Sequence, residues 1–245
     1  MKTIAIYSMK GGVGKTATAV NLAYCAAKSG NFTLICDLDP QAASTFYFRI
    51  KASKNFNASK FIKGGKNIDK NIKGTDFLNL DLLPSKLSYR NFDLALDALK
   101  NSTKKLKAIF KEIEDDYDYL FLDCPPGISL ISENVFNASD IILVPLIPTT
   151  LSVRSYIKLL KFFKKNKMNN SKIYPFFSMV EKRKSLHINT INKIGKKKNN
   201  FLTTQIPYRS DIEKMGIEKR PVPEYAGNSL ASESYFSLWE EINGL

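Results

Sequence analysis

The sequence predicts an α/β fold, a doubly wound and mainly parallel sheet with helices on both faces. Short apolar runs of strand length alternate with helical patterns along the chain, the order that βαβ units produce. Glycine-rich or acidic segments directly follow three of these runs. Parallel sheets gather ligands at the carboxyl ends of their strands, so this placement also favours the fold. A length of 245 residues is compatible with one domain, and we expect a single domain over residues 1–245.

The first of these segments is residues 9–16, Met-Lys-Gly-Gly-Val-Gly-Lys-Thr, between a β-prone run at 3–7 and a helical pattern at 17–29. Backbone N–H groups of such a turn and the N-terminus of the next helix form a cradle for phosphate. A plain glycine-rich turn is the alternative, but the Lys-Thr ending matches the P-loop, whose lysine contacts the β- and γ-phosphates and whose hydroxyl binds Mg²⁺. We therefore predict a P-loop NTPase with ATP and Mg²⁺ as cofactors, held by Lys10, Gly11, Gly12, Val13, Gly14, Lys15, Thr16 and Ala17.

Two further apolar runs end in aspartate. The run at 33–36 leads into Asp37-Leu38-Asp39-Pro40-Gln41, and the run at 119–122 leads into Asp123. The second of these, an apolar strand that ends in Asp123, is the Walker B arrangement, which puts a carboxylate near the metal of a P-loop NTPase. The first delivers two carboxylates, Asp37 and Asp39, at its carboxyl end, where a parallel sheet collects its ligands. Asp-Pro can also simply begin a turn. The position of Asp37-Leu38-Asp39-Pro40-Gln41 one helix after a P-loop favours a catalytic role for this segment instead.

The remaining elements follow in order. We expect a short helix and a mobile surface connection over 51–76, a strand at 77–83, and helices around 86–100 and 103–115. Further strands are expected at 140–145, 172–180 and 201–206. A helix begins near Thr150 or Ser152 as N-cap, and its core stripe is Val153, Tyr156, Ile157, Leu160 and Phe163. The closing helix is expected to pack through Leu230, Phe236, Trp239 and Ile242.

The net charge of +14 is concentrated in one block. Residues 152–220 hold 18 Lys and Arg against 4 Asp and Glu, and the rest of the chain holds 19 of each sign. A basic block on an otherwise balanced protein is typical of a polyanion-binding surface. A solvated basic face without a partner is the alternative.

The motifs resemble those of the ParA/MinD family of deviant Walker A ATPases, and most of all a small ParA (Soj-like) partition ATPase. Met9 stands where the usual P-loop has glycine, and a second lysine, Lys10, precedes the glycines. In that family this extra lysine reaches across a dimer interface to the partner's nucleotide. The resemblance implies that Asp37 helps to hold the water shell of Mg²⁺ and that Asp39 orients the attacking water. The catalytic candidates are Lys10, Lys15 and Asp39, and the metal candidates are Thr16, Asp37 and Asp123.

The resemblance also implies roles inside the basic block. The segment 206–220 resembles the C-terminal region of ParA proteins, which carries part of the adenine contact and basic residues used on DNA. We expect Met179 or Val180, and Pro207, beside the adenine, with core packing as the alternative for Met179. His187, the only histidine, is expected at the surface or near DNA. The DNA-binding candidates are first Arg209, Lys214, Lys219 and Arg220, and second Lys182, Arg183, Lys184 and Lys196–Lys198.

The function implied is a weak, partner- and DNA-stimulated ATPase that forms an ATP-bound homodimer, binds DNA without sequence preference and meets a ParB-like activator. Its cargo would be a plasmid, a chromosome or a protein assembly. Because the P-loop begins at once, we expect no operator-reading helix-turn-helix segment before it. No apolar run approaches the roughly 18 residues of a membrane span, and the N-terminus does not resemble a signal peptide. Three widely spaced cysteines indicate reduced thiols, so a cytoplasmic, nucleoid-associated protein is expected.

Two rival classes stay open. A MinD-like membrane-cycling ATPase is disfavoured because no Lys or Arg follows Arg220, whereas a membrane-targeting helix carries such residues on its polar face. A metal-cluster carrier is disfavoured because the cysteines match no cluster or zinc spacing.

Overall fold

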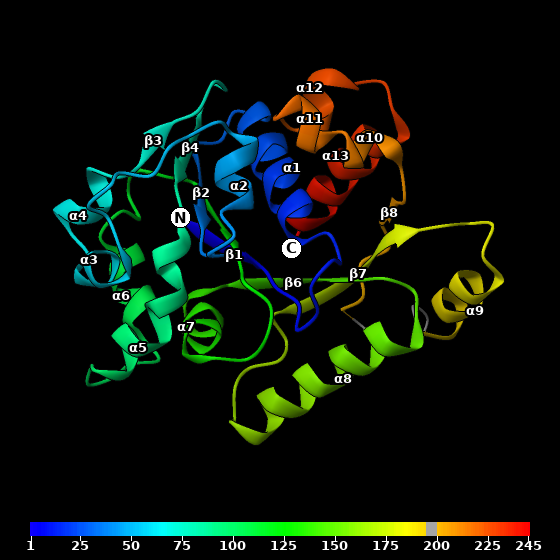
Figure 1. Ribbon diagram of the computed structural model, residues 1–245. Helices are drawn as coiled ribbons and strands as arrows, with labels where there is room; N and C mark the ends of the chain where they lie inside the picture. The colour runs from blue at the N-terminus through cyan, green and yellow to red at the C-terminus, as the bar shows by residue number, and fades with distance from the viewer. Residues whose placement is uncertain (195–199) are drawn as a thin grey trace.

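The computed structural model describes residues 1–194 and 200–245, and its strands form one eight-stranded sheet (Figure 1). The strand order is β3-β4-β2-β5-β1-β6-β7-β8, and all neighbours pair parallel except β3 with β4. The predicted doubly wound, mainly parallel sheet is therefore confirmed. The strands are β1 (Lys2–Ile6), β2 (Thr33–Asp37), β3 (Lys73–Gly74), β4 (Leu80–Leu83), β5 (Tyr119–Asp123), β6 (Ile141–Leu146), β7 (Ile173–Val180) and β8 (Gln205–Pro207).

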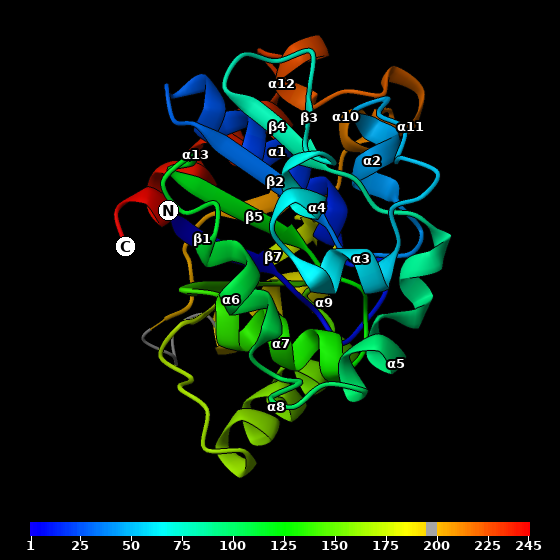
Figure 2. The same cartoon turned by 90° about the vertical axis from the view of Figure 1, so that its left-hand side faces the viewer.

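Helices cover both faces of the sheet (Figures 1 and 2). Alternate residues of β1 enter the two cores, since successive side chains of a strand point to opposite faces: Ile4 and Ile6 to one, Ala5 to the other. The first core is closed by α1 (Lys15–Lys28) and α13 (Leu230–Asn243). The second is closed by α5 (Phe92–Asp97), α6 (Lys105–Lys111), α7 (Leu130–Ala138) and α8 (Thr150–Lys165).

Within 51–76 the expected short helix is present, but the expected mobile surface connection is wrong. This segment forms α3 (Ala58–Lys63), α4 (Lys66–Asp69) and the edge strand β3, and its Phe56 and Phe61 are buried in the second core. The ring of Phe61 meets that of Phe92 edge-on at 5.2 Å between centroids. Each such aromatic pair contributes about 0.5–1.5 kcal/mol beyond its buried area. Phe56 and Phe61, together with Ile62 and Ile68, therefore anchor in the core a polar segment that has no clear hydrophobic period.

Two helices confirm part of the predicted stripe and correct the rest. Tyr156 and Phe163 of α8, and Trp239 and Ile242 of α13, are buried as predicted. The N-cap of α8 is Thr149, and its buried residues are Ser152, Tyr156, Leu159 and Phe163, whereas Ile157 is 42% exposed. The observed spacing of four, three and four residues follows one face of a 3.6-residue helix. In α13, Leu230 is 50% exposed, and the buried residues are Ala231, Ser232, Tyr235, Leu238, Trp239 and Ile242.

The remaining helices are short. They are α2 (Ala43–Tyr47), the 3₁₀ helix η1 (Leu87–Asn91), α9 (Ser185–Ile194), α10 (Ser210–Glu213), α11 (Met215–Glu218) and α12 (Val222–Tyr225). The strand β1 lies between β5 and β6; the connection after β1 runs toward β2, whereas the connection after β6 runs the other way, toward β7. Ligands of doubly wound folds bind at the carboxyl ends of strands near such a reversal. The P-loop follows β1 at this point.

Candidate nucleotide-binding site

The P-loop connects β1 to α1 through backbone that only glycine adopts easily. Gly12 and Gly14 have φ of 69° and 87°, in the left-handed region that strains other residues. Gly14 is also the N-cap of α1. Lys15 begins this helix with its side chain buried, and its Nζ donates to the carbonyl oxygen of Lys10 at 3.4 Å. The buried ammonium thus lies within the loop, where the phosphates of a nucleotide would lie.

Asp37 and Asp123 meet at the ends of neighbouring strands. They are register partners of β2 and β5, and both are fully buried. Burial raises the pKa of Asp37, and the charge of Asp123 raises it further. Burial also raises the pKa of Asp123, although the side chains of Ser44, Thr16 and Lys15 oppose this rise. Two buried carboxylates side by side favour a bound cation, because each ionised carboxylate raises the free energy of ionising the other.

Hydroxyl groups of α2 hold both carboxylates. Ser44 Oγ donates to Oδ2 of Asp123 at 2.7 Å, while Thr45 donates to Oδ2 of Asp37 from its backbone nitrogen at 2.9 Å and from Oγ1 at 2.7 Å. Among the described residues, Oδ1 of Asp123 has no hydrogen-bond partner. A buried carboxylate oxygen without a donor is costly, and a metal ion or its water would satisfy it.

Asp39 lies beside a cleft of about 610 Å³ over the P-loop. Its Oδ1 accepts from the backbone nitrogen of Gln41 at 2.9 Å, and its carbonyl oxygen accepts from Ser85 Oγ at 2.7 Å. The cleft is lined by the P-loop, the segment after β2 and the segment after β5, through Gly11, Gly12, Gly14, Lys15, Thr16, Ala17, Asp39, Pro40, Gln41, Ala43, Tyr47, Pro125 and Pro126.

The residues present fit Mg²⁺. Thr16, Asp37 and Asp123 offer the oxygen ligands that this cation prefers. No group of three or more His, Cys, Asp or Glu side chains within residues 1–194 and 200–245 could hold a metal alone. Mg²⁺ does not need such a cage, because it keeps several waters and binds substrate phosphates. The three cysteines are buried, and burial raises the pKa of each thiol.

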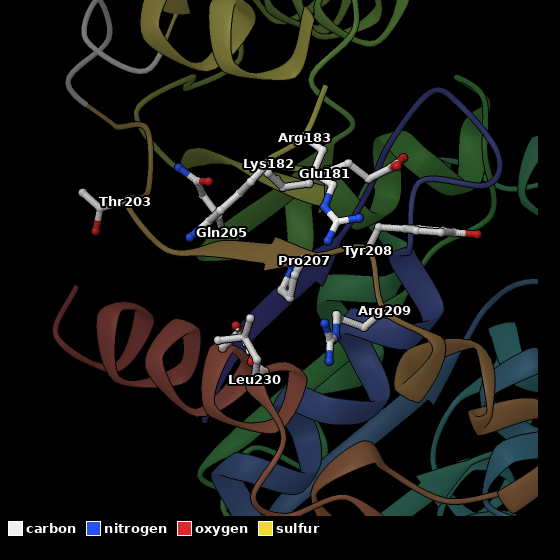
Figure 3. A pocket seen from close by; sticks show the side chains of 11 residues that line it. Glu181, Lys182, Arg183, Thr203, Gln205, Pro207, Tyr208, Arg209 and Leu230 are labelled. Carbon is white, nitrogen blue, oxygen red and sulfur yellow. Dashed lines mark hydrogen bonds between the residues drawn. The ribbon is translucent and has the colours of Figure 1, made fainter. Parts of the chain in front are cut away.

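A second opening, of about 830 Å³, lies beside the ends of β7 and β8 (Figure 3). Val180 and Pro207 line it, while Met179 does not. Met179 instead has a φ of 54°, at an irregularity in the pairing of β7 with β8. The end of β7 adjoins the P-loop, since a Cβ on Gly14 would lie 3.0 Å from Ser178 Oγ. The candidate adenine residues therefore lie close to the phosphate cradle.

A family model described as an AAA domain matches residues 1–174. The sporulation initiation inhibitor protein Soj of Bacillus subtilis (strain 168) is 28% identical over 247 residues, covering 98% of both chains. The chain belongs to the ParA/MinD family of P-loop ATPases.

Solved structures agree with this membership. A plasmid partition protein of Borrelia burgdorferi B31 bound to AMPPNP is 28% identical to this ParA/MinD ATPase, with a TM-score of 0.82 over 99% of this chain and 97% of that one. A complex of a Cyanothece McdA variant with ATP has a TM-score of 0.86 over 100% of this chain and 97% of that one. It is 22% identical, so it supports the fold alone.

The DNA-binding candidates of this ParA/MinD ATPase fall into two groups. Lys182, Arg183 and Arg209 line the opening in Figure 3. Lys214, Lys219 and Arg220 follow on the segment that contains α10 and α11. Some candidates have partners: Arg209 lies 3.8 Å from Asp211, Arg220 lies 2.9 Å from Glu218, and Lys184 pairs with Glu181. Lys196–Lys198 lie outside the described residues.

The expectation that His187 is a surface residue is wrong, because only 4% of it is exposed. Its Nδ1 accepts a hydrogen bond from the backbone nitrogen of Glu181 at 3.1 Å, which requires Nδ1 to be unprotonated. Burial lowers the pKa of His187, and Lys184 lowers it further. In this ParA/MinD ATPase the histidine therefore joins α9 to the end of β7.

The hydroxyl residues of the site were not predicted from the sequence. Ser44, Thr45 and Ser85 contact Asp123, Asp37 and Asp39 through the hydrogen bonds given above. The Ser-Thr pair that follows Asp-Pro-Gln-Ala-Ala was the available signal. Ser and Thr near the start of a helix usually act as caps, so the pattern alone did not indicate that these residues contact the aspartates.

Proposed function

We propose that this ParA-family ATPase binds ATP and Mg²⁺ over the P-loop and couples hydrolysis to reversible DNA binding. The ATP-bound form is a sandwich homodimer, and a ParB-like partner stimulates turnover to segregate or position a plasmid, a chromosome or a protein cargo. The observation that carries the proposal is the convergence of Lys15, Asp39 and the unpartnered oxygen of Asp123 at the ends of adjacent strands. The Borrelia relative bound to AMPPNP supports ATP as the nucleotide.

The reaction follows from the properties of the side chains. Lys15 binds the β- and γ-phosphates and stabilises the negative charge that develops on them. Thr16, Asp37 and Asp123 would hold Mg²⁺ and its waters, and the ion supplies further neutralisation of phosphate charge when bound. Asp39 orients the attacking water from the edge of the cleft. Its Oδ1 already accepts a hydrogen bond from Gln41, and this bond limits its rotation.

Dimerisation would complete the site through Lys10. This residue is half-buried in the loop, and no ion pair to it occurs among the described residues. A lysine without an acidic partner beside a phosphate site is available for the nucleotide of a second copy. Because Lys10 of each copy would contact the nucleotide bound to the other copy, dimer formation would depend on ATP.

The basic block supplies the DNA-binding surface. Lys182, Arg183, Lys214 and Lys219 are exposed. Phosphate contacts of this kind give affinity without reading bases, and each one adds to the salt dependence of binding. Dimerisation would place two such surfaces on one particle, so DNA affinity would rise in the ATP-bound state.

A MinD-like membrane role is less well supported. Within residues 1–194 and 200–245, no helix combines the length and apolar character needed to span a bilayer. The last helix, α13, buries Tyr235, Leu238 and Trp239 against α1 and the sheet. An interfacial helix needs its apolar face free for lipid, so α13 could not take that role without leaving the core.

The experiment compares Lys15→Ala with Lys28→Ala, an exposed lysine in the last turn of the same helix. Binding of a fluorescent ATP analogue with Mg²⁺ is measured by titration, and DNA retention is measured with ATP and with ADP. Lys15→Ala is expected to weaken nucleotide binding at least about 10-fold, because hydrogen bonds to charged groups contribute about 1.5–3 kcal/mol each. Lys28→Ala is expected to match the wild type. Equal binding by both variants would show that the site is misassigned.

A further inference from the structure

Helix α2 lies across the ends of two strands and reaches the carboxylates of both. Its consecutive residues Ser44 and Thr45 point to different aspartates, Asp123 on β5 and Asp37 on β2. The two aspartates are register partners, and Ser44 and Asp123 are 79 residues apart in sequence. A single turn of helix therefore sets the orientation of both acidic groups.

Each hydroxyl holds one oxygen and leaves the other. Ser44 holds Oδ2 of Asp123, and Oδ1 of that carboxylate has no partner among the described residues. Thr45 holds Oδ2 of Asp37 with two hydrogen bonds, while within residues 1–194 and 200–245 Oδ1 accepts only a longer one, from the backbone of Asp39 at 3.2 Å. Packing alone would favour satisfying every buried oxygen. The asymmetry instead leaves one oxygen of each aspartate available for a ligand.

A second layer of hydrogen bonds holds the hydroxyl of Thr45. The backbone nitrogen of Ser85 donates to Oγ1 of Thr45 at 2.9 Å, and Ser85 Oγ donates to the carbonyl oxygen of Asp39. One network thus reaches Asp37, through Thr45, and the backbone of Asp39. Ser44 is fully buried and Thr45 is 6% exposed, so water does not compete for these bonds.

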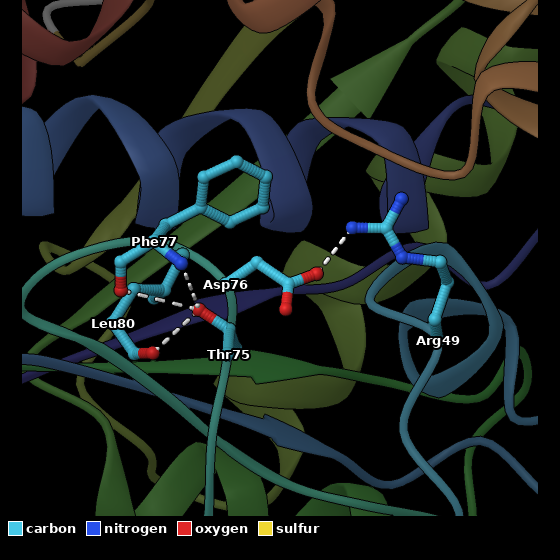
Figure 4. A network of polar contacts seen from close by, with 5 residues as sticks. All are labelled: Arg49, Thr75, Asp76, Phe77 and Leu80. Atoms are coloured by element: carbon cyan, nitrogen blue, oxygen red, sulfur yellow. Dashed lines mark hydrogen bonds and ion pairs between the residues drawn. The ribbon is translucent and has the colours of Figure 1, made fainter.

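The far end of α2 is also tied down. Arg49, just after the helix, forms an ion pair with Asp76 (Figure 4). The turn that presents Asp76 is closed by Thr75, whose Oγ1 donates to the carbonyl oxygen of Leu80 at 2.7 Å and accepts from the backbone nitrogen of Phe77 at 3.1 Å. The pair itself is exposed and contributes little stability, but it limits how far the end of α2 can move.

We propose that Ser44 and Thr45 are positioning residues of the ATPase. They hold Asp123 and Asp37 in the rotamers that turn Oδ1 of each toward the Mg²⁺ site, and they do not touch the nucleotide themselves. The inference rests on the proposed ATP and Mg²⁺ binding. It adds that Ser44 and Thr45 determine how much Mg²⁺ the ATPase needs to bind the nucleotide. Residues behind metal ligands typically change metal affinity or activity about 10- to 100-fold when removed.

Four variants test this inference. Ser44→Ala removes the hydroxyl on Asp123. Thr45→Val removes the hydroxyl on Asp37 but keeps the side-chain shape and the backbone donor, and Thr45→Ser keeps the hydroxyl. Ser139→Ala is the matched control, because Ser139 is also buried and its Oγ donates to the carbonyl oxygen of Val135 at 2.7 Å, at the opposite end of the sheet.

The first readout is the Mg²⁺ concentration that half-saturates the binding of a fluorescent ATP analogue, titrated from EDTA. Ser44→Ala is expected to raise it about 10-fold. Thr45→Val is expected to raise it less, because the backbone nitrogen of residue 45 still donates to Asp37. Thr45→Ser and Ser139→Ala are expected to stay near the wild type. Melting temperature without nucleotide is the second readout, and it monitors folding for every variant.

The outcomes distinguish an error in the positioning role of Ser44 and Thr45 from an error in the proposed ATP and Mg²⁺ binding. If Ser44→Ala and Thr45→Val lower the melting temperature as Ser139→Ala does but leave the Mg²⁺ requirement unchanged, the hydroxyls are only structural and the inference is wrong. If the wild type itself binds the ATP analogue without any effect of Mg²⁺, the proposed function is wrong and the inference falls with it. A raised Mg²⁺ requirement that Thr45→Ser does not show supports the inference.

Discussion

Asp37 and Asp123 stand opposite each other at the carboxyl ends of adjacent parallel strands, and neither side chain is exposed. Their closeness follows from β2 and β5 being neighbours in the sheet, although their sequence positions are far apart. Without a cation, two buried negative charges on neighbouring strands repel each other and lower the free energy of unfolding. The proposed metal site is therefore also a source of instability in this ATPase.

The first prediction concerns pH and stability. The folded pKa of Asp37 is raised above its ordinary value by burial and then by Asp123. Burial of Asp37 therefore costs no stability through ionisation below its unfolded pKa, near 3.9. The free energy of unfolding falls as pH rises from there through the folded pKa. Asp37→Asn, measured without nucleotide or metal, is expected to raise the melting temperature relative to the wild type more at pH 8 than at pH 5. Each kcal/mol relieved corresponds to about 2–4 °C.

The same variant is expected to lose that advantage when ATP and Mg²⁺ are added. The wild type then gains stability from binding, by an amount that grows with ligand concentration, and Asp37→Asn gains less. Thermal melts in four conditions, with and without ligand at each pH, measure both effects. An equal difference at pH 5 and pH 8 would contradict the raised pKa.

The second prediction concerns Lys10, whose carbonyl oxygen accepts from Lys15. Lys10→Ala keeps this backbone contact, so some ATP binding is expected to survive. ATP-dependent dimerisation is expected to be lost, because the side chain would no longer reach the second nucleotide. Size-exclusion chromatography with ATP and Mg²⁺ measures the change. A variant that dimerises like the wild type would remove the model in which Lys10 acts across the interface.

The third prediction separates nucleotide binding from hydrolysis. Asp39 lies at the edge of the cleft and forms no covalent bond in the proposed reaction. Asp39→Ala is expected to bind ATP normally and to slow turnover at least about 100-fold, within the range of a positioned acid–base group. The variant would accumulate as a DNA-bound dimer. Asp97→Ala, an exposed aspartate on α5, is the control, and unchanged turnover in Asp39→Ala would move the role to another residue.

The fourth prediction concerns DNA. Lys219 Nζ lies 4.9 Å from the ring centroid of Phe46, on α2, so one DNA-binding candidate contacts the helix that holds Asp37 and Asp123. Arg209→Ala and the double variant Lys219→Ala/Arg220→Ala are expected to weaken duplex binding equally on all sequences. The log–log salt slope is expected to fall by roughly 1 for each lost phosphate contact.

DNA retention at two salt concentrations measures that slope. Lys111→Ala, an exposed lysine of α6, is the control for general loss of charge. ATP hydrolysis without DNA or partner is expected to change little. If both test variants keep wild-type affinity and slope, the basic block is a solvated face and DNA is not the partner.

The sequence by itself determined the features that are local along the chain. The P-loop between a strand and a helix, and the aspartates at the ends of β2 and β5, could be predicted because each depends on residues adjacent in sequence. The alternation of apolar runs with helical patterns was sufficient to predict the parallel sheet. The roles of the individual site residues stay predictions.

Only the tertiary structure decided the features that depend on pairs distant in sequence. Ser44 contacts Asp123 because β2 and β5 pair, and no local pattern carries that pairing. His187 is buried beside the end of β7, where its ring accepts a hydrogen bond from the backbone of Glu181. The polar segment 51–76 is ordered because a few aromatic side chains reach a core made by other elements. Hydrophobic burial and hydrogen bonds between distant residues outweigh local propensity wherever a local pattern is weak.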